Sequence, residues 1–109
     1  MTLVITTHRL PEPSMTIAIT PQGAISSENA HMLHERVIAV LAATRPQRIV
    51  VDLRAVPSID EAGVDALRAV QDVASAQGAR LVLADPDPRV RELLRHSGLT
   101  QLSDAPVRV

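Results

Sequence analysis

The chain carries two hydrophobic patterns, one typical of buried strands and the other of amphipathic helices. Uninterrupted apolar runs stand at 49–51 and 81–84, and such runs favour strands that are covered on both faces. We therefore expect residues 49–51 to form a strand in the middle of a sheet, with helices over both faces. Three other segments repeat apolar residues every three or four positions, which predicts one buried face per helix. These positions are Ala30, Leu33, Val37, Val40 and Leu41, then Val64, Leu67, Val70 and Ala74, and finally Val90, Leu93 and Leu94.

The beginning of the chain predicts two antiparallel strands. Residues 3–7 and 15–20 are rich in Val, Ile and Thr, and Pro11 and Pro13 lie between them. Proline lacks an amide donor and pushes the preceding residue toward extended geometry, so this connection predicts a turn. Near the other terminus, residues 107–109 could add a short edge strand.

Polar residues mark where the helices begin and end. Asp60 and Asp87 stand where an N-cap side chain can accept a bond from a free amide, and Pro88 suits a first helical position. Residues 26–29 offer similar capping groups before the first helix, which we expect to end near Ala43. The glycines predicted to follow the second and third helices are Gly78 and Gly98.

This order of elements predicts an α/β fold in a single domain spanning residues 1–109. We expect a mixed sheet of four or five strands with an N-terminal antiparallel hairpin and three to four helices, because strand–helix–strand connections favour parallel pairing. Loops beyond the carboxyl ends of such strands are the usual place for ligands and partners. The segment 50–67 contains such a junction and is the first candidate for function.

Composition excludes several functions. The chain has no Cys, no aromatic residue and no Lys, and its formal net charge is −1. Stacking platforms for single-stranded nucleic acid, lysine chemistry and a basic nucleic-acid footprint are therefore ruled out. No apolar run approaches the ~18 residues of a membrane span. We expect a soluble, cytoplasmic domain with neither a nucleic-acid partner nor membrane insertion.

Three segments carry a resemblance to a known family. They are DLRAVPSIDEAGVDAL at 52–67, GAISSENA at 23–30, and ARLVLADPDPRVRELLRHSGL at 79–99. Their order resembles STAS domains of the anti-sigma factor antagonist family, and Asp60 and Gly63 match the family's Asp-Ser-Ser/Thr-Gly motif. The resemblance implies a STAS-like fold and binding to an anti-sigma factor or a related kinase-like regulatory protein.

The chain departs from this family at its regulatory position. The resemblance places Glu61 where family members carry a phosphorylated serine, Ala62 at the second hydroxyl position, and Ser26 where an acidic residue is usual. Phosphorylation at position 61 is thereby excluded, and Ser58 is the substitute hydroxyl on the same loop. Glu61 would imitate the phosphorylated form in part, or it would simply favour the helix dipole at an exposed start.

These residues predict a binding module rather than an enzyme. We find no convergent nucleophile, base and oxyanion donor, and His31 and His34 lack a third metal ligand at a recognised spacing. No cofactor or metal is expected. The alternative function is a small-ligand-binding or transport-complex accessory domain of the same fold. The predicted partner-binding residues are Ser26, Ser58, Ile59, Asp60, Glu61, Ala62, Gly63 and Asp65.

Overall fold

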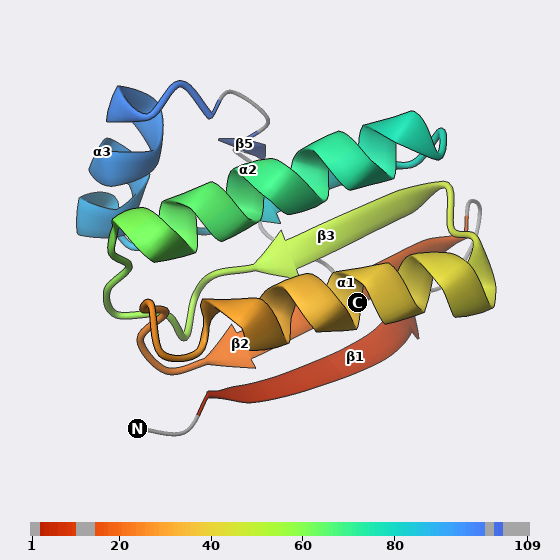
Figure 1. Cartoon of the computed structure of the whole chain (residues 1–109), viewed down its shortest axis with the longest axis horizontal. Coiled ribbons are helices and arrows are strands. Elements are labelled where there is room, and N and C mark those ends of the chain that lie inside the picture. Colours follow the sequence, from red (N-terminus) through yellow and green to blue (C-terminus); the bar gives the residue numbers. More distant parts are fainter. Residues whose placement is uncertain (1–2, 11–14, 100–101, 104–109) are drawn as a thin grey trace.

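A five-stranded sheet runs through the protein, and its strands lie side by side in the order in which they occur in the chain (Figure 1). The computed structural model describes residues 3–10, 15–99 and 102–103. The elements are β1 (Val4–Leu10), β2 (Thr16–Gln22), α1 (Ala30–Thr44), β3 (Arg48–Asp52), α2 (Glu61–Ala76), β4 (Arg80–Ala84), α3 (Pro88–His96) and β5 (Leu102–Ser103).

The pairing of the strands confirms the predicted mixed sheet. β1 runs antiparallel to β2, whereas β2, β3, β4 and β5 run parallel to one another. Each parallel connection contains a helix, as crossover connections require. The fifth strand of the described chain is Leu102–Ser103. The strand predicted at 107–109 lies outside the described residues.

α1 and α2 lie over one face of the sheet (Figure 1), and all three helices contribute buried residues to one hydrophobic core. Ile49 and Val51 of β3 belong to this core, but Val50 points to the other face, where it is aligned with Ala18 and Val82. Within residues 3–10, 15–99 and 102–103, helices cover only the core face of β3, so the expectation of helices over both faces is wrong for this part of the chain, although Val50 itself is buried. Because the strand order follows the chain, successive right-handed crossovers return on the same side of the sheet. An apolar run does not reveal that order.

Most of the predicted helix boundaries are confirmed. Asp87 Oδ1 accepts a hydrogen bond from the Arg89 N–H at 2.9 Å, and α3 begins at Pro88. Gly78 and Gly98 follow α2 and α3 with φ of +77°, a conformation that glycine adopts at low cost. The first helix ends at Thr44, one residue beyond the expected Ala43.

An ion pair between a buried aspartate and a largely exposed arginine closes the carboxyl end of β3. The side chain of Asp52 is 3% exposed and lies 2.7 Å from the Arg54 guanidinium, measured between Oδ2 and Nη2. Its Oδ1 also accepts the Arg54 backbone N–H at 3.1 Å. The hydrogen bond with Asp52, together with the carboxylate charge, raises the pKa of Arg54 above its usual range. This contact fixes the turn that leads from the central strand toward α2.

Candidate functional site

Two loops at the carboxyl ends of β2 and β3 are joined by backbone hydrogen bonds. The Gly23 N–H donates to the Ala55 carbonyl at 3.0 Å, and the Ile25 N–H donates to the Ser58 carbonyl at 3.1 Å. In the other direction, the Asp60 N–H donates to the Ile25 carbonyl at 3.2 Å. These bonds hold the predicted site residues of both loops in one continuous surface.

Asp60 ties the two loops together a second time, through its side chain. Its Oδ1 accepts a hydrogen bond from the Gly63 N–H at 3.0 Å, which confirms the predicted N-cap of α2. Its Oδ2 accepts another from the Ser27 N–H at 3.1 Å. This second bond could not be predicted from the sequence, because only the pairing of β2 with β3 brings residues 27 and 60 together.

Gly63 is required by close packing beneath the site. It is buried in the first turn of α2, and a Cβ added there would lie 2.5 Å from Ile59 Cγ1 and 2.9 Å from Ile25 Cγ2. These distances are too short for a side chain unless both isoleucines shift. The absence of a Cβ therefore allows α2 to begin directly against the paired loops.

Asn29 holds the backbone of Ser26 and does not make the capping bond that was predicted for residues 26–29. Asn29 is the N-cap residue of α1, but its side chain makes no capping bond. Instead, Asn29 Oδ1 accepts from the Ser26 N–H at 2.9 Å, and its Nδ2 donates to the Ala24 carbonyl at 3.0 Å. Asn29 is buried, so these bonds satisfy its amide. The capping group expected from residues 26–29 thus braces the first loop.

The predicted partner-binding residues divide into a supporting set and a surface set. Ile59 and Gly63 are buried, and Ala62 and Ser26 are partly buried. The exposed members are Ser58, Asp60, Glu61 and Asp65. Glu61 and Asp65 are four residues apart in α2 and so lie on the same side of the helix. The surface available to a partner is therefore acidic at the start of α2.

An open groove between α2 and α3 continues from this acidic surface. Its volume is about 460 Å³, and Glu61 and Asp65 stand on its α2 side. Arg68 crosses from α2 toward α3, where its Nη2 donates to the Ser97 carbonyl. The remaining lining residues are Val64, Leu93 and His96. The α3 residues were not among the predicted site residues, because no sequence motif links the third helix to the second.

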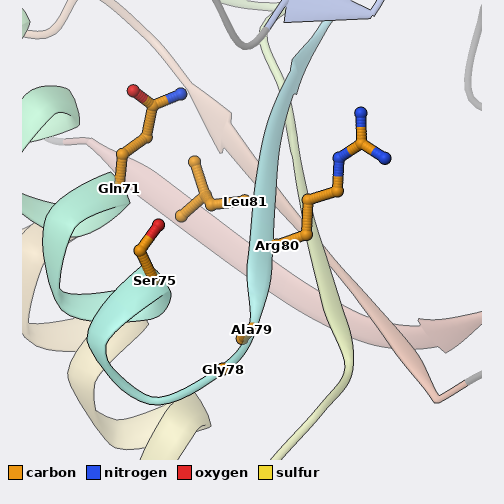
Figure 2. A pocket seen from close by; sticks show the side chains of 6 residues that line it. All are labelled: Gln71, Ser75, Gly78, Ala79, Arg80 and Leu81. Atoms are coloured by element: carbon orange, nitrogen blue, oxygen red, sulfur yellow. The ribbon is translucent and has the colours of Figure 1, made fainter.

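A second hollow lies at the other end of α2, beside the start of β4 (Figure 2). Its volume is about 380 Å³. Gln71 and Ser75 extend from α2 toward Leu81, whereas Arg80 extends from the other side of β4 (Figure 2). The Gln71 Nε2 is buried without a hydrogen-bond partner in the described structure. This hollow shares no lining residue with the groove at Glu61.

The described part of the chain has neither a cluster of metal ligands nor a membrane-spanning helix. Across residues 3–10, 15–99 and 102–103, no group of three or more His, Cys, Asp or Glu side chains could hold a metal ion. None of the helices in that part has both the length and the apolar character needed to cross a membrane.

Comparisons with known proteins assign the fold. A family model described as the STAS domain matches residues 7–108. The anti-sigma factor antagonist SpoIIAA in its unphosphorylated form is 18% identical, with a TM-score of 0.79 over 94% of this chain and 88% of that protein. An anti-sigma factor antagonist from Mycobacterium paratuberculosis is 23% identical, with a TM-score of 0.75 over 94% of this chain and 87% of that one.

The fold also occurs within larger proteins. The murine anion transporter Slc26a9 matches 84% of this chain with 16% of its own, at 16% identity and a TM-score of 0.72. At these identities the structural likenesses establish the fold alone. A comparison with curated proteins gave no match.

Proposed function

The chain belongs to the STAS domain family, and on this premise we propose that it is a regulatory protein-binding module of the anti-sigma factor antagonist type. It docks the exposed surface around Asp60 and Glu61 onto an anti-sigma factor or a related kinase-like protein. The proposal includes a cytoplasmic location and no catalytic activity of its own.

The observation that carries this proposal is the exposed acidic start of α2, which hydrogen bonds hold against both loops. Asp60 and the backbone bonds between the two loops fix the position of Glu61 relative to both loops. A preorganised surface loses little conformational entropy when a partner binds, so more of the contact energy contributes to affinity. The α2–α3 groove extends this surface with apolar area from the partly exposed Leu93.

Glu61 sets the regulatory state in this proposal. A phosphoserine carries about −1.5 to −2 charges, whereas a glutamate carries about −1, so Glu61 imitates the phosphorylated form in part. The family resemblance associates negative charge here with release of the partner kinase. We therefore propose that the native protein is held in a weak-binding state. The competing interpretation is a carboxylate that only favours the helix dipole, worth about 0.3 to 1 kcal/mol at an exposed helix start.

A charge-reversal pair tests where the partner binds. The immobilised wild-type protein is first used to isolate its partner from the source cell, and that partner is then titrated with Asp65→Arg and Glu35→Arg. Both residues are exposed helix carboxylates, on α2 and α1 respectively, so the two variants change net charge equally. Because negative charge on this surface is assigned to the weak-binding state, we expect Asp65→Arg to strengthen binding about tenfold, or about 1.4 kcal/mol, with Glu35→Arg close to wild type. Equal effects would place the partner elsewhere.

A second candidate function is supported by the hollow beside β4. The unpaired Gln71 Nε2 offers a hydrogen-bond donor to a small ligand, and the likeness to part of Slc26a9 is compatible with a transport-complex accessory domain. Native mass spectrometry of the purified protein tests this reading. A bound small molecule that is absent from the Gln71→Leu variant would support it, whereas a bare mass in both proteins would count against it.

A further inference from the structure

β1 is an end strand of the described sheet, and the direction of its free backbone groups follows from its neighbours. Where β2 meets β3, the Arg48 N–H donates to the Met15 carbonyl at 3.2 Å. Backbone groups of successive residues point to opposite edges of a strand, so the odd-numbered residues of β2 face β3 and the even-numbered ones face β1. In the antiparallel register, even-numbered residues of β1 stand opposite even-numbered residues of β2. The N–H and C=O groups of Ile5, Thr7 and Arg9 therefore point outward.

A side-chain contact supports this direction independently. Arg36 of α1 donates a hydrogen bond from its Nη1 to the Ile5 carbonyl at 3.0 Å. An outward carbonyl is open to such a donor, whereas one engaged in the β1–β2 ladder would face β2. A carbonyl oxygen has two lone pairs, so Ile5 can still accept a bond from another strand.

The edge of β1 has few of the protections that usually prevent strand pairing. Edge strands of monomeric proteins are commonly short, bulged, covered, or marked by charged residues or Pro. In β1, Arg9 is the one positively charged residue, and Arg36 contacts the edge at Ile5. β1 has seven residues, VITTHRL, and its register with β2 is continuous from Val4 to Leu10. Val4 is a large apolar residue with 49% of its surface exposed. This strand is thus open to pairing along its length.

We propose that a second copy of this chain pairs with β1 in antiparallel orientation, around a two-fold axis at Thr7. In this register, the outward N–H and C=O groups of one copy meet those of the other copy. All seven residues of each strand are then paired. Moving the axis to Thr6 or His8 would leave two residues of each strand unpaired. The protein would then form a homodimer with one continuous sheet across both copies.

The side chains are self-complementary in this register. Val4 of one copy lies opposite Leu10 of the other, which covers the exposed Val4 with an apolar side chain. Arg9 lies opposite Ile5, whose carbonyl already accepts the Arg36 guanidinium, so this register brings two arginines close together and limits the affinity. One paired strand makes a small interface, so we expect a weak dimer. β1 lies at the edge of the sheet away from α3, so pairing leaves the α2–α3 groove open (Figure 1).

Opposite charges at the symmetry axis test the register directly. Thr7 is exposed, and in this register it faces Thr7 of the other copy. We expect the wild type to dimerise with increasing concentration, up to about 1 mM, in sedimentation equilibrium. Thr7→Lys and Thr7→Glu should each raise the dissociation constant at least tenfold, and an equimolar mixture of the two should dimerise again. The same changes at exposed Ala39 on α1 should leave the wild-type behaviour unchanged.

A disulfide provides a second measurement that does not depend on charge. The chain contains no cysteine, and the register places Thr6 of one copy opposite His8 of the other. Under oxidation, a mixture of Thr6→Cys and His8→Cys proteins should form mainly the mixed disulfide. A wild type that stays monomeric throughout the concentration series would overturn the proposal. A mixture of charge variants that fails to reassociate, or cysteine variants that form no mixed disulfide, would overturn the Thr7-centred register.

Discussion

Asp60 accepts a hydrogen bond from the backbone N–H of Ser27 at 3.1 Å, 33 residues earlier in the chain. The same carboxylate caps α2 through the Gly63 N–H. One side chain thus connects the loop before α1 with the first turn of α2. The surface proposed for partner binding is therefore a single unit, and a substitution at Asp60 should alter the structure of both loops.

Replacing Asp60 with alanine should loosen both loops. Loss of an N-cap typically costs about 0.5 to 2 kcal/mol, and loss of the bond to Ser27 should add about 0.5 to 1.5 kcal/mol. Urea denaturation would measure the total, and hydrogen exchange would show lost protection at the Ser27 amide. Asp87→Ala removes only a local cap of α3, so it should leave that amide protected. Unchanged protection in Asp60→Ala would mean that its bond to Ser27 does not form in solution.

Gly63→Ala should destabilise the protein, although alanine is normally the better helix former by roughly 0.5 to 1 kcal/mol. The reason is the short approach of the new Cβ to Ile59 Cγ1 and Ile25 Cγ2. Overpacking of this kind typically costs about 1 to 3 kcal/mol. Thermal unfolding of Gly63→Ala, Ile59→Ala and the double variant would measure it. The double variant should lose less stability than the sum of the single ones, whereas full additivity would argue against a clash with Ile59.

Arg54→Ala should destabilise more than the loss of an exposed ion pair does. Asp52 would keep its backbone donor at residue 54 but lose the guanidinium that faces its buried carboxylate. A buried carboxylate that loses one of its hydrogen-bond partners destabilises the folded state. Glu92→Ala breaks the exposed pair with His96, which we expect to cost less than about 1 kcal/mol. Similar losses in urea for the two variants would contradict the role given to Asp52.

The native protein should not be phosphorylated in stoichiometric amounts by its partner kinase. Glu61 and Ala62 have no hydroxyl, and the backbone of Ser58 is held by the Ile25 N–H. Incubation with ATP followed by mass spectrometry should find little or no phosphate at Ser58, whereas Glu61→Ser should accept phosphate at position 61. Full occupancy at Ser58 would show that the regulatory site lies three residues upstream of position 61.

Helix caps and helix ends could be predicted from the sequence because they depend on neighbouring residues. The caps at Asp60 and Asp87 and the glycines at 78 and 98 were all predicted, since each depends on the conformation of a few adjacent residues. The hairpin and the strand–helix order likewise followed from the hydrophobic pattern.

Contacts between segments that are far apart in the chain could not be predicted from the sequence. The bond from Ser27 to Asp60, the contact of Arg68 with Ser97 and the bracing role of Asn29 all depend on how segments pack together. The face of the sheet that the helices cover could not be predicted either. An apolar run such as 49–51 is compatible with helices on one face or on both. These contacts complete the candidate site, and they came only from the structure.

The affinity of Glu61→Ser for the partner isolated with the wild type tests the central claim most directly. Calorimetric titration with a non-hydrolysable ATP analogue prevents phosphorylation of the restored hydroxyl, and Glu61→Asp serves as the charged control. We expect Glu61→Ser to bind about 5- to 150-fold more tightly than wild type, equivalent to about 1 to 3 kcal/mol, and Glu61→Asp to match wild type. Equal affinities for wild type and Glu61→Ser would contradict the account and leave Glu61 as a helix-start residue only.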